Sequence, residues 1–196
     1  MASAEFQGDA LPPPPPPPQP RPRPRPGAAH AGLRIVLFAL GLTSVVVMLQ
    51  SKQTVYVSVP GVPYPVPVQA KWTQSPAFVY FVVAMSIVGL YGLITAIAAL
   101  CFALKKTASR AGALLVYLIW DVVMLGLVAS TAGTAGATAY IGFEGNKNAG
   151  WAKICDVYGT FCHRVAASII ISLIAGIVLI ILIILSAHSL HRRVHK

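Results

Sequence analysis

Four long apolar stretches dominate the chain, and the short segments between them hold nearly all of its charged residues. The stretches cover about residues 33–50, 77–104, 111–140 and 165–187. Each is long enough to cross a bilayer as a helix, which takes about 20 apolar residues. Lipid offers no partner to an unpaired backbone group, and no alternating pattern suggests a β-barrel. The pattern therefore predicts an all-α membrane protein with a four-transmembrane-helix bundle.

The segment before the first stretch has low complexity. An unbroken run of prolines, Pro12 to Pro18, is followed by alternating proline and arginine up to Pro26. Proline fixes φ and lacks an N–H group, so this segment is expected to be extended and disordered. We therefore divide the chain into a Pro-rich tail (1–32), a membrane domain (33–187) and a basic C-terminal tail (188–196). The Pro-rich tail either binds a proline-recognising module or acts as an inert spacer.

Composition supports a membrane protein and excludes a large soluble catalytic domain. Of the 196 residues, 56% are hydrophobic and only 10% are charged. About a quarter of the residues in a soluble domain are charged, so this chain could not cover a water-exposed surface. The net charge of +10 favours contact with membrane lipids. Nucleic acid is not a predicted partner, because the basic residues are dispersed and no aromatic platform accompanies them.

The placement of the basic residues predicts the orientation of the spans. Nine lie in the two terminal tails and the second connection, and five lie in the other two connections. The nine are Arg21, Arg23, Arg25, Lys105, Lys106, Arg110, Arg192, Arg193 and Lys196, and the five are Lys52, Lys71, Lys147, Lys153 and Arg164. Basic residues are enriched on the cytoplasmic side of membrane proteins. Both termini are therefore predicted to be cytoplasmic.

Two charged residues, Arg34 and Asp121, fall inside predicted spans, and helix geometry places both in the same half of the membrane. A charge at this depth is costly and needs a partner. One interpretation is a buried ion pair that fixes the packing of two helices or links two protomers. Alternatively, Arg34 extends to the headgroups while Asp121 is protonated or bonded to a hydroxyl. A third interpretation makes Asp121 a proton or ion relay in a small channel or transporter.

Small residues recur at helical spacing in three spans. The second span contains Gly92 and Ala96, and the sets in the third and fourth spans are Gly126, Ser130, Gly133 and Ala137, and Ser168, Ser172 and Gly176. Such faces let helix backbones approach closely where lipid provides no hydrophobic drive. They indicate helix packing, either within one bundle or between protomers.

The connections on the side opposite the termini contain the remaining features. Val55, Val57 and Val59 alternate with other residues and suggest a short strand before several prolines. The last connection contains Cys155 and Cys162, which the predicted topology places on the oxidising side. A disulfide is the first interpretation, and free thiols are the alternative. His163 next to Cys162 does not complete a metal-ligand set, so neither a metal nor a cofactor is predicted.

Several motifs resemble the plant CASP-like family, relatives of the Casparian strip membrane domain proteins, and most of all its first subgroup. They are Arg34, Ser51-Lys52-Gln53-Thr54, Ser75-Pro76-Ala77-Phe78, Asp121 and the connection GNKNAGWAKICDVYGTFCHRV. The resemblance covers roughly residues 33–187. It implies a plasma-membrane protein that forms homodimers, higher homo-oligomers and hetero-oligomers with related four-span proteins. In the Casparian strip members such assemblies mark a membrane domain and recruit cell-wall-modifying machinery. Here the first connection lacks the aromatic-rich signature of those members.

The resemblance therefore implies a plasma-membrane scaffold. An enzyme is not expected, since no nucleophile, base and orienting partner occur together on one face. The competing hypothesis is a small channel or transporter that uses Asp121.

Overall fold

The computed structural model describes residues 26–58, 61, 63–104 and 111–194 of the chain. The predicted Pro-rich segment before Pro26 lies outside the described residues. Within these residues the main elements are four long helices and a two-stranded hairpin, together with two short 3-10 helices, η1 (Trp72–Gln74) and η2 (Lys147–Ala149). The long helices are α1 (Pro26–Leu49), α2 (Pro76–Leu104), α3 (Ala111–Glu144) and α4 (Gly159–Val194), and the strands are β1 (Lys52–Val57) and β2 (Val66–Lys71).

All four helices are long and apolar enough to cross a membrane, which confirms the predicted four-span class. The helices extend beyond the predicted apolar stretches. α1 begins at Pro26, inside the segment assigned to the tail, and α4 continues through the predicted C-terminal tail to Val194. Hydropathy detects only the apolar part of a helix, whereas backbone hydrogen bonding continues into the polar flanks.

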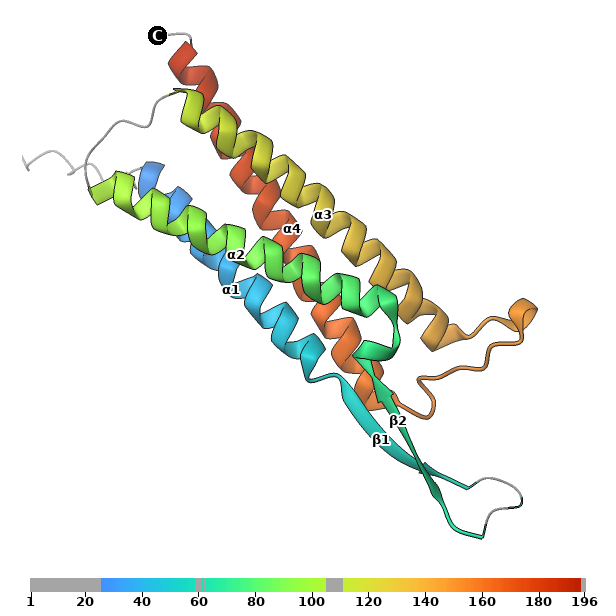
Figure 1. Ribbon diagram of the computed structural model, residues 1–196. Helices are drawn as coiled ribbons and strands as arrows, with labels where there is room; N and C mark the ends of the chain where they lie inside the picture. The colour runs from blue at the N-terminus through green and yellow to red at the C-terminus, as the bar shows by residue number, and fades with distance from the viewer. Residues whose placement is uncertain (1–25, 59–60, 62, 105–110, 195–196) are drawn as a thin grey trace, which may run out of the picture.

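The helices form an elongated bundle in which α1 packs against α2 and α4, and α3 packs against α4 and α2. Figure 1 shows that the start of α1 and the end of α4 lie at one end of the bundle. The hairpin and the α3–α4 connection lie at the other end, which we call the hairpin end. This arrangement agrees with a chain that crosses a membrane an even number of times.

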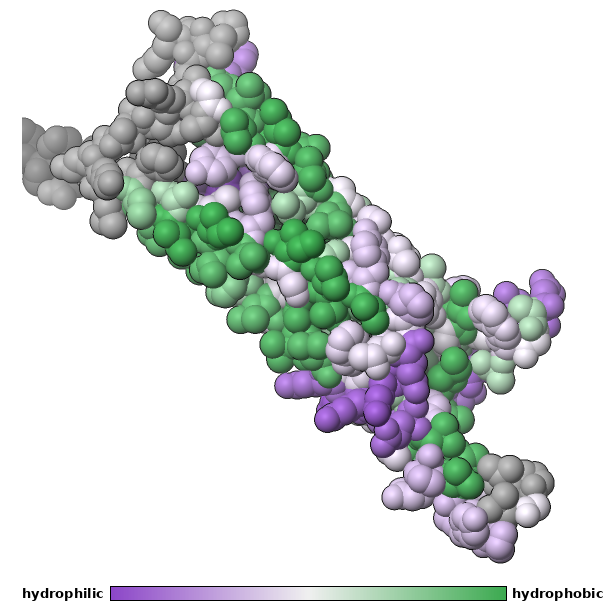
Figure 2. Space-filling model, in the orientation of Figure 1, coloured by the Kyte–Doolittle hydropathy of each residue, from purple (hydrophilic) through white to green (hydrophobic). Residues whose placement is uncertain are grey.

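The interior of the bundle is apolar, and so is most of its outer surface. Phe81, Leu37 and Leu179 are fully buried, while Ile94, Val83 and Ile177 expose more than half of their surface. Figure 2 shows a hydrophobic belt along the helices, with hydrophilic residues gathered at the hairpin end. An apolar surface of this kind would be unfavourable in water, but it is favourable in contact with the hydrocarbon chains of lipids.

α1 and α2 approach each other most closely at glycines. A Cβ atom added at Gly41 would lie 2.9 Å from the Cα atom of Gly89, and one added at Gly92 would lie 3.0 Å from the backbone nitrogen of Phe38. Gly92 was predicted to be a packing residue, but Gly41 and Gly89 were not. The two backbones can meet here only because these positions have no side chains.

The hairpin adds a small sheet to a fold that was predicted to be all-α. β1 pairs with β2 in an antiparallel register that sets Lys52 opposite Lys71 and Tyr56 opposite Pro67. The sequence indicated the first strand but not the second, because prolines discourage strand assignment. A two-stranded ribbon tolerates Pro67, since each strand is an edge strand and the missing N–H group can face outward.

Candidate functional site

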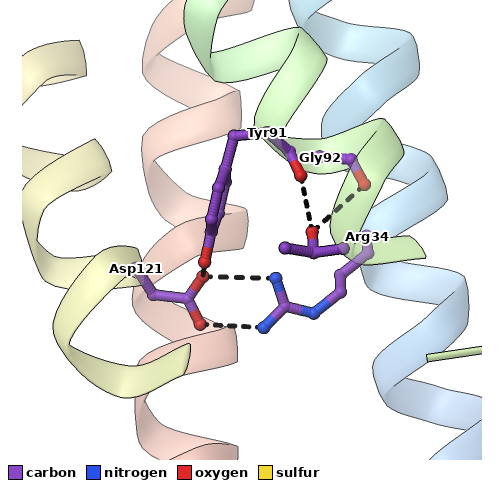
Figure 3. A network of polar contacts seen from close by, with 5 residues as sticks. Arg34, Tyr91, Gly92 and Asp121 are labelled. Carbon is purple, nitrogen blue, oxygen red and sulfur yellow. Dashed lines mark hydrogen bonds and ion pairs between the residues drawn. The ribbon is translucent and has the colours of Figure 1, made fainter. Parts of the chain in front are cut away.

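Arg34 and Asp121 form an ion pair (Figure 3). Arg34 lies in the first half of α1, so the pair is buried toward the end of the bundle where α1 begins. The two terminal nitrogens of the Arg34 guanidinium donate to the two carboxylate oxygens of Asp121, with N–O distances of 3.3 and 3.1 Å. The hydroxyl of Tyr91 donates to the same carboxylate at 2.6 Å. The side chains of Arg34 and Asp121 are 4% and 0% exposed. Three residues, one each from α1, α2 and α3, therefore meet in a buried network in which one positive charge is paired with one negative charge.

Two aromatic rings enclose the guanidinium group. Its central carbon lies 5.8 Å from the ring centroid of Tyr91 and 5.0 Å from that of Tyr117. An arginine over an aromatic face gains electrostatic attraction, and the gain increases when water is excluded. In this conformation Arg34 does not extend along the helix surface toward the headgroups.

Sequence reasoning identified the two charged residues but missed both tyrosines. Tyr117 precedes Asp121 by four residues, so it lies on the same face of α3. That spacing was a usable signal. Tyr91 is linked to the pair only by the packing of α2 on its neighbours, which no local pattern reports.

The small residues of α4 pack inside the bundle. Ser168 and Ser172 are fully buried, and the Cβ position of Gly176 would contact Val128 of α3 at 3.5 Å. The hydroxyl of Ser44, on α1, donates to the backbone oxygen of Ser168 at 3.0 Å. Close approach therefore lets a hydroxyl on α1 reach the backbone of α4.

The connection between α3 and α4 is closed by a disulfide between Cys155 and Cys162. Gly145 turns the chain out of α3 with a φ of 69°, and a Cβ atom there would lie 2.7 Å from the carbonyl oxygen of Trp151. The bonded pair of Cys155 and Cys162 supports the predicted disulfide over free thiols. The bond anchors the connection to the first turn of α4.

A model of the Casparian strip membrane protein domain matches residues 24–178. The chain belongs to this family. It is similar to CASP-like protein 1D1 of Populus trichocarpa, with 46% identity over 86% of both chains. CASP-like protein 1D2 of Glycine max is 48% identical over 84% of this chain and 83% of its own length. CASP-like protein Ni6 of Beta vulgaris subsp. maritima is 41% identical over the full length of both chains. No solved structure matches the chain significantly.

These matches confirm the family resemblance inferred from the sequence. The matched region of this CASP-family chain includes the whole Arg34–Tyr91–Asp121 network and both disulfide cysteines. The three relatives' names given above state no enzymatic activity. Within the part of the chain that the structure describes, no three His, Cys, Asp or Glu residues are grouped so that they could hold a metal ion.

The small residues on α3 of this CASP-family chain differ from those on α4. Gly126, Ser130, Gly133 and Ala137 are all exposed on the outside of the bundle. No atom of another helix lies within 4 Å of a Cβ atom added at Gly126 or Gly133. Ser130 reaches a neighbouring helix through a 3.2 Å hydrogen bond with the hydroxyl of Tyr80. Packing within one bundle therefore does not explain this face, which we call the open α3 face.

Replacing Cys155 and Cys162 with serine is expected to destabilise the α3–α4 connection by about 2–3 kcal/mol. The disulfide closes a short loop, with a sequence separation of 7, so its loss frees that loop in the unfolded state. Hydrogen exchange of the connection, compared with that of α2, measures the effect. Alkylation of unreduced wild-type protein at both cysteines would contradict the disulfide.

Proposed function

We propose that this chain is a non-enzymatic scaffold of the plasma membrane, which assembles with copies of itself and with related four-span proteins. The observation that carries the proposal is the open α3 face of Gly126, Ser130, Gly133 and Ala137. In the most apolar 18-residue segment of α3, 22% of the residues are buried, compared with 28% in α1 and 39% in each of α2 and α4. A helix with this much uncovered surface has room for a second bundle.

The Arg34–Asp121 ion pair has a structural role in this proposal. Both carboxylate oxygens of Asp121 accept hydrogen bonds from Arg34, and one also accepts from Tyr91. A carboxylate held this way supports a fixed helix arrangement better than a proton or ion relay, which needs a partner that can exchange its proton. The fixed bundle would then present the same α3 surface in every copy.

The proposed orientation follows from the basic residues. The end at which α1 begins and α4 ends would face the cytoplasm, as the positive-inside rule favours. The hairpin and the disulfide-closed connection would face the cell exterior, where a disulfide is stable. Membership of the Casparian strip domain family supports a further proposal, that the assemblies organise a membrane domain and recruit cell-wall-modifying machinery.

Gly133→Leu combined with Ala137→Leu is expected to weaken self-association by about tenfold, or about 1.4 kcal/mol. The added side chains would separate backbones that touch across small residues. Energy transfer between donor-labelled and acceptor-labelled chains in liposomes measures the change. Ala167→Leu is the matched control, because Ala167 is an exposed small residue on α4.

Equal energy transfer in the variant and the control would show that α3 is not the contact surface. A chain that crosslinks to no neighbour in its native membrane would contradict the scaffold itself. Ion flux through liposomes that Asp121→Asn abolishes would instead support the channel hypothesis.

A further inference from the structure

A pocket of about 200 Å³ lies at the hairpin end of the bundle, between the start of α2, the end of α3 and the start of α4. Its walls are mostly apolar and include Phe78, Ala139, Phe143, Ile154, Phe161 and Val165. Phe78, Phe161 and Val165 are buried, whereas Phe143 and Ile154 are 39% and 51% exposed. The pocket therefore has an apolar floor and an open mouth.

The pocket is held in shape by rigid parts of the fold. The rings of Phe78 and Phe161 pack edge to face with centroids 6.1 Å apart. The disulfide partners Cys155 and Cys162 form part of the wall. Ligand pockets that are largely preformed and apolar, with a few polar groups at the edge, are typical of small-molecule sites.

A polar hollow of about 430 Å³ adjoins the pocket and shares Ala70 and Lys71 with it. The remaining lining comes from Lys52, Gln53, Thr54 and Gln69 on the hairpin. Figure 2 shows hydrophilic residues gathered in this region, directly beside the hydrophobic belt. The apolar pocket and the cationic hollow therefore meet at Ala70 and Lys71.

No acidic side chain of the described residues pairs with the two lysines of the hollow. Lys52 and Lys71 are directly opposite each other in the hairpin register, and like charges in that position repel. Among the described residues, the ion pairs are Arg34–Asp121 and Lys153–Glu144, neither of which includes these lysines. An anionic group placed between the two ammonium groups would relieve the repulsion.

The geometry points to an anionic phospholipid as the occupant, with part of one acyl chain in the apolar pocket and its phosphate between Lys52 and Lys71. The lysines lie at the base of the hairpin, three residues after α1 ends at Leu49 and five before α2 begins at Pro76. They would thus lie where a helix leaves the hydrocarbon, so the occupant would be an anionic lipid of the leaflet at the hairpin end. A group the size of a water molecule occupies about 30 Å³. The pocket of about 200 Å³ therefore holds only a short part of an acyl chain. The rest of the lipid stays in the leaflet.

Photocrosslinking with a phosphatidylglycerol that carries a diazirine near the end of one acyl chain tests this site. The full chain is placed in phosphatidylcholine liposomes that contain a small fraction of the probe, and the labelled peptides are mapped by mass spectrometry. Labelling is expected in the peptides that contain Phe143 and Val165, two pocket residues on different helices. A phosphatidylcholine probe with the same diazirine chain should label them several-fold less.

The Lys52→Gln, Lys71→Gln double variant is expected to lower labelling by the anionic probe by about tenfold. The Lys147→Gln, Lys153→Gln variant is the matched control, since it removes two charges from the α3–α4 connection and should leave labelling unchanged. Ala139→Phe, which fills the pocket, should abolish labelling. Ala129→Phe, on the exposed surface of the same helix, should not.

Equal labelling of the two lysine double variants, or equal labelling by the two probes, would overturn the site. So would labels confined to the outer surface of the belt. If Ala139→Phe fails to fold, competition on the unaltered chain decides the question. Unlabelled phosphatidylglycerol should displace the probe, and displacement by phosphatidylcholine at the same concentration would overturn the proposal.

Discussion

Asp121→Ala is expected to lower the free energy of unfolding by about 3–5 kcal/mol, the usual cost of removing one partner of a buried ion pair. The substitution leaves the guanidinium of Arg34 in a site where its side chain is only 4% exposed. It also removes the acceptor of the Tyr91 hydroxyl. Reversible unfolding in mixed micelles, followed by the fluorescence of the native tryptophans, measures the loss.

The double variant Arg34→Met, Asp121→Leu is the control for this prediction. It removes both charges, and apolar residues of similar size often replace a buried ion pair without loss of stability. The loss should therefore shrink from about 3–5 kcal/mol to about 1–3 kcal/mol, the cost of the unpaired Tyr91 hydroxyl. If the double variant is as unstable as Asp121→Ala, the ion pair does not account for the effect.

Gly41→Ala is expected to destabilise the bundle by about 1–3 kcal/mol, although alanine is the better helix former. A Cβ atom at Gly41 would lie 2.9 Å from the Cα atom of Gly89, and a backbone atom cannot rotate away. α1 and α2 would have to separate along their contact. The same micelle unfolding assay measures the change.

Gly32→Ala, on the same helix, is the matched control, because a Cβ atom there meets nothing within 4 Å. It should be neutral, or stabilising by up to about 1 kcal/mol through helix propensity alone. A similar loss from both substitutions would mean that glycine at Gly41 matters for a reason other than close packing.

Hydropathy predicted the number and positions of the spans, because crossing lipid demands long apolar helices whatever they pack against. It also singled out Arg34 and Asp121, since a charged residue inside a span is rare enough to stand out. The disulfide between Cys155 and Cys162 could be inferred from topology. These features depend on the solvent around the chain, which the sequence reflects directly.

Helix ends and helix partners could not be predicted in the same way. α1 begins at Pro26 and α4 extends to Val194, because hydrogen bonding continues where hydropathy falls. The second strand was missed because its Pro67 is compatible only with an edge position.

The sequence by itself determined that this chain is a four-span membrane protein with two charges inside the membrane. Only the tertiary structure decided that Tyr91 and Tyr117 surround the ion pair, and that similar small residues are buried on α4 but exposed on α3. The physical reason is that a small residue or an aromatic ring has the same local pattern on any face of an apolar helix. In lipid both faces are hydrophobic, so periodicity cannot tell which one is covered by a neighbour.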